Sequence, residues 1–289
     1  MPQNMPASLF KRHIALPQDH GSWVFILSPL LVGLFAGERF TPASVNLIVA
    51  AMGAFLLRQP VSMAVKAYSG RRSREDLPAA RFWMLVYGTL ILLALAGLVA
   101  EGYTFVLFLA VPGLPVFGWH LRLVSRRAER RQAGVEILAT GALALAAPAA
   151  FWIGREVYDA LGWALWLGAW LQSAASIVYA YLRLEQREMR VGQESPGNGK
   201  QAAGPGRSAL WRMGRRAFAY TSFNLALALV LGGAAILPRW IFVPYLLQWA
   251  ETLWGIFRPA IGWKPVKIGV RQLAVSTLWT VLFIITWRL

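Results

Sequence analysis

The chain has 289 residues, of which 57% are hydrophobic, and a formal net charge of +16. Such a charge would indicate nucleic-acid binding in a soluble protein, but here the basic residues stand between long apolar runs. We therefore reject nucleic acid as the main partner. The sequence contains no cysteine, which excludes disulfides, zinc–thiolate sites and cysteine nucleophiles.

Apolar stretches of about 17 residues or more recur along the chain, and as helices they can cross a hydrocarbon layer of about 30 Å. Some do so only with help from flanking residues. They predict an all-α, polytopic membrane protein in which residues 1–289 form one integral membrane domain. In chain order, the nine expected spans are 21–38, 41–57, 83–100, 103–119, 135–153, 160–182, 217–238, 240–257 and 270–287.

The basic residues predict how these spans are oriented. With nine spans, all but four of the 29 Lys and Arg residues fall on one side of the membrane. Basic residues gather in cytoplasmic loops, so we expect a cytoplasmic N-terminus and a C-terminus outside. Residues 1–20 are polar and lack the early apolar core of a cleaved signal peptide, so the first span should be retained. The four exceptions are Arg39, Arg155, Arg239 and Arg288.

Two expected cytoplasmic loops are longer than a minimal turn. The first runs from Arg58 to Phe82, and its residues 60–68 have helical potential that Ser69-Gly70 should end. The second runs from Arg183 to Arg216 and contains a stretch rich in Gly and Pro. We expect residues 187–215 to form a flexible cytoplasmic tether between the first six helices and the last three.

Prolines and small residues shape the expected fourth and fifth spans. Pro112, Pro115 and Pro148 each lack a backbone donor and should bend their helices. The small residues of 139–150 permit close helix approach. Both features favour packing over ligand binding.

The first polar cluster opens the first span, as Pro17-Gln-Asp-His-Gly-Ser-Trp23. His20 lies near the cytoplasmic interface, with Trp23 one turn away on about the same face. His20 could donate a hydrogen bond to an anionic headgroup or act as an acid or base. Alternatively, Asp19 and Ser22 cap the helix and Trp23 anchors it at the interface. Both interpretations stay open, because the polar run is longer than capping requires.

The second cluster consists of Arg58, Lys66 and Arg81, at the two ends of the first long loop. Three cations at a helix-lined mouth form a site for phosphate or carboxylate. Snorkelling of Arg58 to the headgroups is the alternative.

The third cluster ends the sixth span, where Gln172, Ser176, Tyr179 and Arg183 follow a spacing of three to four residues. Tyr179 and Arg183 could reach the same cytoplasmic mouth. Interhelical hydrogen bonding is the alternative role of this stripe.

Among the acids, Glu136 and Glu251 are expected to be immersed in the membrane. Glu136 has nearby arginines to pair with, whereas Glu251 is deeper, has no assigned partner and is a candidate functional residue. Asn224 is a weaker candidate. The three histidines are dispersed and no pair of aspartates has metal-bridging spacing, so no metal or other cofactor is expected and magnesium is doubtful.

At His20-Gly-Ser-Trp23 the chain resembles the YwiC-like family of bacterial membrane proteins, which begin with a Pro-x-x-His-Gly-x-Trp motif. The basic stretch 58–81, Tyr179-x-Tyr-x-Arg183 and Lys264-Pro-Val-Lys-Ile-Gly269 reinforce the likeness, which covers most of the chain. The resemblance implies the cytoplasmic (inner) membrane of a bacterium, and it implies no particular activity.

The layout also resembles the UbiA prenyltransferases, with nine helices, a cytoplasmic N-terminus and enlarged cytoplasmic loops after helices two and six. Those enzymes join an isoprenoid diphosphate to an acceptor, and aspartates in the two loops bind the magnesium that holds the diphosphate. Here the loops begin with Arg58 and Arg183 and lack those aspartates. The resemblance therefore implies the fold but not the magnesium mechanism.

Together these features lead to the hypothesis of a cytoplasm-facing cationic cavity that binds a membrane lipid or isoprenoid with an anionic head. If the protein is an enzyme, cationic side chains would stabilise a departing anion in the transfer of a prenyl or lipid-linked group. The alternative is a non-enzymatic transporter or an accessory subunit of a membrane complex. The expected ligand-binding residues are His20, Trp23, Arg58, Lys66, Arg81, Tyr179, Arg183 and Glu251.

Overall fold

The computed structural model describes residues 9–17, 20–126, 132–189 and 206–289. In those residues all regular structure is helical, which confirms the all-α prediction. The chain divides into two compact units, residues 1–166 and 167–289, and each is described by itself.

Six helical segments of the described residues are long and apolar enough to cross a membrane, so the chain is a multi-pass membrane protein. The other three expected spans fall on shorter or more polar helices. Residues 21–36 are apolar but short, the helix at 242–257 has 16 residues, and the helix at 207–233 begins with a segment rich in arginine. The six segments are Pro42–Tyr68, Arg74–Ala100, Thr104–Ser125, Ala133–Arg155, Leu161–Glu188 and Pro265–Trp287.

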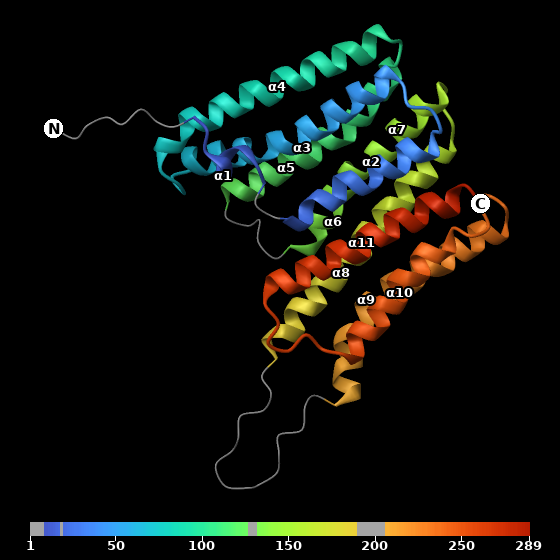
Figure 1. Cartoon of the computed structure of the whole chain (residues 1–289). Helices are drawn as coiled ribbons and strands as arrows, with labels where there is room; N and C mark the ends of the chain where they lie inside the picture. Colours follow the sequence, from blue (N-terminus) through green and yellow to red (C-terminus); the bar gives the residue numbers. More distant parts are fainter. Residues whose placement is uncertain (1–8, 18–19, 127–131, 190–205) are drawn as a thin grey trace, which may run out of the picture. The chain divides into compact units, whose positions relative to one another are not determined.

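Unit 1 is a bundle of helices with short 3₁₀ turns between some of them (Figure 1). Helices α3 and α4 pack side by side in antiparallel directions, and α2 packs on α7. The elements are α1 (Arg12–Ala15), η1 (His20–Trp23), α2 (Val24–Ala36), α3 (Pro42–Tyr68), η2 (Arg74–Asp76), α4 (Leu77–Ala100), η3 (Thr104–Leu109), α5 (Ala110–Ser125), α6 (Ala133–Ala144) and α7 (Ala146–Arg155).

Helix α3 begins with a reciprocal cap and continues past its expected membrane span. The Thr41 hydroxyl accepts from the Ser44 amide at 3.4 Å, and the Ser44 hydroxyl accepts from the Thr41 amide at 3.1 Å. The helix runs through Pro60 to Tyr68, where Gly70 adopts a φ of +69°. The first part of the loop expected at 58–82 is therefore an extension of the helix.

The expected fifth span is broken at Leu145, between α6 and α7. Pro148 explains the position of the break, because the amide hydrogen that it lacks would have donated to the carbonyl of Ala144, four residues earlier. Pro115 lies inside α5, and Pro112 lies in its first turn, directly after the 3₁₀ turn η3.

Helices α2 and α7 approach each other through small residues. A Cβ on Gly33 would clash with the carbonyl oxygen of Ala147, and a Cβ on Gly154 would lie 2.8 Å from the backbone of Gly37. Any side chain larger than the hydrogen atom of glycine at these two positions would therefore force the two backbones apart. Two ion pairs close this end of the crossing, Arg39 to Glu156 at 2.9 Å and Arg155 to Glu38 at 3.5 Å.

The segment before the first apolar helix is tied to the C-terminal half of α3, to η2 and to the N-terminal half of α4. Ile14 is fully buried, and the carbonyl of Ala15 accepts from the Tyr87 hydroxyl at 3.0 Å. Lys11 Nζ lies 2.8 Å from Asp76 Oδ1, and Gln59 donates to the His13 carbonyl at 2.9 Å.

Unit 2 consists of α8 (Leu161–Glu188) from residue 167 onward, α9 (Arg207–Gly233), α10 (Phe242–Phe257) and α11 (Pro265–Trp287). Helices α9 and α10 form an antiparallel hairpin, and α10 also packs on α11 (Figure 1). The flexible tether expected at 187–215 overlaps α8 at residues 187–188 and α9 at residues 207–215, and its residues 190–205 lie outside the described residues.

We predict that Gly33→Ala destabilises unit 1 by about 1–3 kcal/mol, because the added methyl group forces α2 away from α7. Thermal unfolding of the purified protein in detergent measures the effect. Gly88→Ala in α4 is the control, since a Cβ there meets nothing within 4 Å and alanine favours the helix. Equal unfolding temperatures for the two variants would contradict the close crossing.

Candidate functional site

The polar stripe expected on α8 lies inside unit 2. Gln172, Ser176, Tyr179 and Arg183 are each at most 3% exposed. Polar groups in an apolar membrane bundle are costly unless they find partners. Helices α10 and α11 supply those partners, so the stripe joins three helices.

The part of the network farthest from the end of α8 is made of amides and hydroxyls. Gln172 Nε2 lies 3.1 Å from Ser176 Oγ and 3.3 Å from Ser276 Oγ of α11. Gln248 of α10 donates to the Gln172 carbonyl at 3.0 Å and to Ser176 Oγ at 3.1 Å. These contacts hold α8, α10 and α11 in register.

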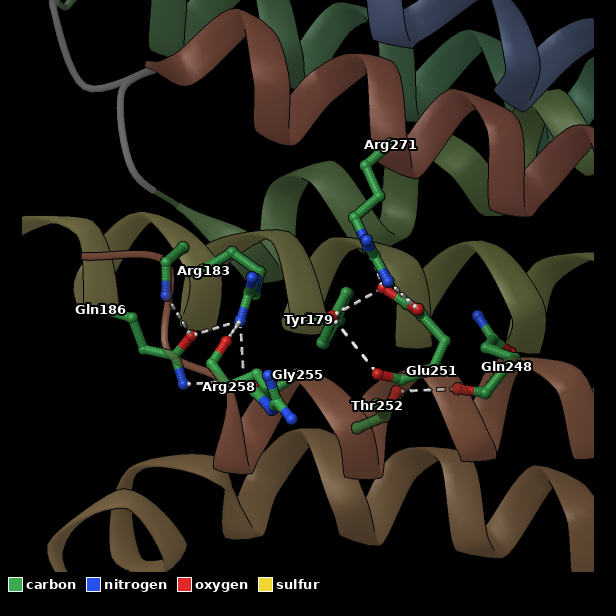
Figure 2. Close-up of polar contacts among 10 residues, drawn as sticks. Tyr179, Arg183, Gln186, Gln248, Glu251, Thr252, Gly255, Arg258 and Arg271 are labelled. Atoms are coloured by element: carbon green, nitrogen blue, oxygen red, sulfur yellow. Dashed lines mark hydrogen bonds and ion pairs between the residues drawn. The ribbon is translucent and has the colours of Figure 1, made fainter. Parts of the chain in front are cut away.

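The charged centre of the network is the carboxylate of Glu251 (Figure 2). Arg271 binds it with two nitrogens, Nε to Oε1 at 2.6 Å and Nη2 to Oε2 at 2.7 Å. The Tyr179 hydroxyl donates to Oε1 at 2.9 Å. A Cβ at Gly255, one turn further along α10, would clash with Tyr179, so glycine there lets the phenol ring reach this position.

Arg183 binds the carboxyl end of α10, which finishes at Phe257. Its Nη1 lies 2.7 Å from the carbonyl oxygens of Gly255 and Arg258 and 2.8 Å from Gln186 Oε1 (Figure 2). A cation at this end satisfies carbonyls that have no partner within the helix and opposes the negative end of the helix dipole. The buried guanidinium therefore has a structural use in fixing the end of α10.

Two indole rings cover the cations of this region. The Arg271 guanidinium carbon lies 3.9 Å from the Trp254 ring centroid, and that of Arg183 lies 5.0 Å from the Trp263 centroid. Lys267 Nζ is 4.2 Å from the Trp263 centroid. Cations over indole faces are attracted by the ring quadrupole, so these tryptophans hold positive charge in place.

Basic residues outnumber acids at this end of the bundle. From the start of α10 to the end of α11, Glu251 is the one acid, whereas four basic residues surround the α10–α11 connection. Lys264 and Lys267 are exposed, and the Arg271 side chain is 36% exposed. The basic residues are Arg258, Lys264, Lys267 and Arg271.

The other residues expected to bind a ligand belong to unit 1. The Trp23 and Phe55 ring centroids lie 5.2 Å apart, and the Arg58 guanidinium carbon is 5.2 Å from the Phe55 centroid. Arg81 donates to the Tyr68 hydroxyl at 2.7 Å, and Lys66 lies half-buried in the last turn of α3. Trp23 and Arg58 thus meet at Phe55.

His20 begins the 3₁₀ turn η1, whereas Gln18 and Asp19 lie outside the described residues. Asn224 of α9 donates to the Leu171 carbonyl at 2.9 Å, which ties α9 to α8. In the described part of the chain, no group of three His, Asp or Glu side chains could hold a metal ion.

Sequence reasoning missed Arg271, Gln186 and the two tryptophans Trp254 and Trp263. The sequence offered one signal for Arg271: it lies near the start of the last expected span, and Glu251, on the preceding span, had no assigned partner. Hydrophobic periodicity gives the face of a helix but not the neighbour that the face meets, so the pairing of Glu251 with Arg271 required the structure.

Comparison with known proteins places this geometry in context. Residues 16–151 match the model of a family described as YwiC-like protein. A protein of Bacillus subtilis (strain 168), described as "Uncharacterized protein YwiC", is 23% identical over 264 residues, which cover 89% of this chain and 92% of the relative. No solved structure matches the chain. The findings support the resemblance to the YwiC-like family, and the family match lies within unit 1.

Proposed function

From the premise of a multi-pass membrane protein similar to the YwiC-like family, we propose that the chain binds the anionic head of an isoprenoid or another lipid at its cytoplasmic side. The observation that carries the proposal is the excess of basic residues around Glu251 on α10 and α11. A phosphate or carboxylate head would supply the missing negative charge, and the guanidinium of Arg271 has the fork geometry that binds such groups.

The surroundings of Arg271 suit a ligand that is polar at one end and apolar at the other. Lys264 and Lys267 are exposed on the turns before Arg271. Trp254 and Trp263 present apolar ring surface beside these cations, as side chains at a membrane interface do. Arg183 is a positioning residue in this proposal, because its bonds to the end of α10 hold Glu251 and Trp254 opposite α11.

The proposal also includes the unit 1 residues on the expected cytoplasmic side. Trp23 and Arg58 both contact Phe55 and so combine a cation with aromatic surface. His20 begins the same turn as Trp23, Lys66 lies in the last turns of α3, and Arg81 lies near the start of α4. We propose a UbiA-like bundle for the whole chain, without its magnesium chemistry. Binding of an anionic head is the function that these residues support, and group transfer would require a further reactive partner.

A non-enzymatic transporter is the second candidate, and the helix break at Leu145 favours it, because transporters carry broken helices at their binding sites. It ranks second because Pro148 explains the break. Residues 144–154 around the break are also all buried and carry no polar side chain except the indole of Trp152, so they offer few groups that could bind a substrate.

We also propose that the chain crosses the membrane nine times, with its N-terminus in the cytoplasm and its C-terminus outside. Because the sequence lacks cysteine, single introduced cysteines report sidedness without background. In intact cells we expect a membrane-impermeant maleimide to label Val157→Cys and Ile236→Cys, but to label Ser73→Cys and Ser208→Cys only after lysis. Residue 208 lies in the first turn of α9 and residue 236 follows its end, so equal labelling of these two would contradict a ninefold crossing.

Ligand binding is tested by native mass spectrometry with farnesyl phosphate and with farnesol, which share a tail and differ in the charge of the head. We expect bound farnesyl phosphate and little bound farnesol. Lys267→Gln, which leaves the Glu251–Arg271 pair intact, should weaken farnesyl phosphate binding about tenfold, the equivalent of about 1.4 kcal/mol. Arg212→Gln, an exposed position on α9, is the control of equal charge change.

Dioleoyl phosphatidic acid and dioleoylglycerol, measured in parallel, distinguish an acyl tail from an isoprenoid tail. Equal binding of charged and neutral heads, or equal effects of Lys267→Gln and Arg212→Gln, would contradict the proposed site.

A further inference from the structure

We propose that Glu251 is an internal anion that occupies Arg271 until the phosphate head of a lipid replaces it. This inference rests on the proposed function and narrows it, because it names phosphate rather than carboxylate as the head. The observation behind it is that the group that would bind a ligand is already bound by a carboxylate of the same chain.

The contact between Glu251 and Arg271 has the form that a bound ligand would have. Both carboxylate oxygens are engaged, at 2.6 and 2.7 Å, by two nitrogens of one guanidinium. Such bidentate pairing is the way arginine binds the carboxylates and phosphates of ligands. Glu251 therefore satisfies the donors that a lipid head would otherwise use.

The two partners differ in their access to the outside of the bundle. The side chain of Arg271 is 36% exposed, whereas that of Glu251 is 11% exposed. One face of the guanidinium is covered by Trp254, at 3.9 Å. An incoming anion would thus reach Arg271 from its exposed edge, while Glu251 withdraws on the buried side.

Glu251 keeps a partner after such a replacement. The Tyr179 hydroxyl also donates to Oε1, at 2.9 Å, and Tyr179 is 3% exposed. A carboxylate that retains one hydrogen bond costs less to displace than one left with none. The exposed Lys264 and Lys267 would offset the second negative charge brought by the ligand.

Competition of this kind selects the type of head. A carboxylate ligand would exchange one carboxylate for another, and the internal one has the advantage of a high effective concentration. A phosphate monoester carries more negative charge and more acceptor oxygens, so it gains more from the two lysines and Arg271. The ligand class that fits is therefore a lipid phosphate and not a fatty acid.

Native mass spectrometry of the full-length protein with farnesyl phosphate and with oleate tests this inference. The wild type should bind farnesyl phosphate and little oleate. Glu251→Gln should bind farnesyl phosphate at least about tenfold more tightly, because Arg271 no longer has an internal anion. The same variant should also bind oleate. The control is Glu185→Gln, which removes an exposed acid of α8 and should change neither affinity.

Tyr179→Phe provides a second measurement that changes no charge. It should weaken farnesyl phosphate binding several-fold, because displaced Glu251 then lacks its remaining donor. Thermal unfolding checks that each variant is folded. If Glu251→Gln does not fold, Tyr179→Phe is the variant that tests the inference. Unchanged binding in Tyr179→Phe would then overturn the inference.

The failure of the inference is distinguishable from that of the proposed function. If wild type and Glu251→Gln bind farnesyl phosphate equally, or if the wild type binds oleate as well as farnesyl phosphate, Glu251 is not a competitor and the site itself stands. If neither protein binds any charged lipid, the proposed function fails and the inference fails with it.

Discussion

The pairing of the Glu251 carboxylate with Arg271 and Tyr179 is the interaction on which unit 2 depends. An unpaired carboxylate in an apolar bundle would cost several kcal/mol, so the acid must find donors wherever the helices pack. It finds them on α11 and α8, at 2.6–2.9 Å. One side chain of α10 therefore fixes the positions of two other helices. A substitution at any of the three residues should disturb the contacts of the other two.

The same requirement explains the neighbouring contacts. Arg183 is buried and binds carbonyls at the end of α10, where helix geometry leaves acceptors unpaired. The donors of the Arg183 guanidinium are thus used on carbonyls of the same chain. Unlike Arg183, the residues Arg258, Lys264 and Lys267 are exposed, and the side chain of Arg271 is 36% exposed.

Sequence reasoning was most informative where local periodicity decides the outcome. It found the polar stripe of α8, including Tyr179 and Arg183, and it singled out Glu251 as an acid in need of a partner. It could not identify Arg271 as the partner of Glu251, because periodicity does not say which helices are neighbours. The crossing at Gly33 was missed for the same reason, since only the packed backbone of Ala147 shows why glycine is needed. Hydropathy also ends α3 at the membrane surface, whereas the helix continues to Tyr68.

A double-mutant cycle of Glu251→Gln and Arg271→Gln tests the central claim most directly. Reversible unfolding of the four proteins in mixed detergent gives the free energies of unfolding. If the pair fixes the packing of unit 2, the two substitutions are coupled by about 2 kcal/mol, since Arg271→Gln alone leaves the carboxylate of Glu251, 11% exposed, without its cationic partner. Additive effects, within about 0.5 kcal/mol, would show that the two residues act independently and would contradict the account.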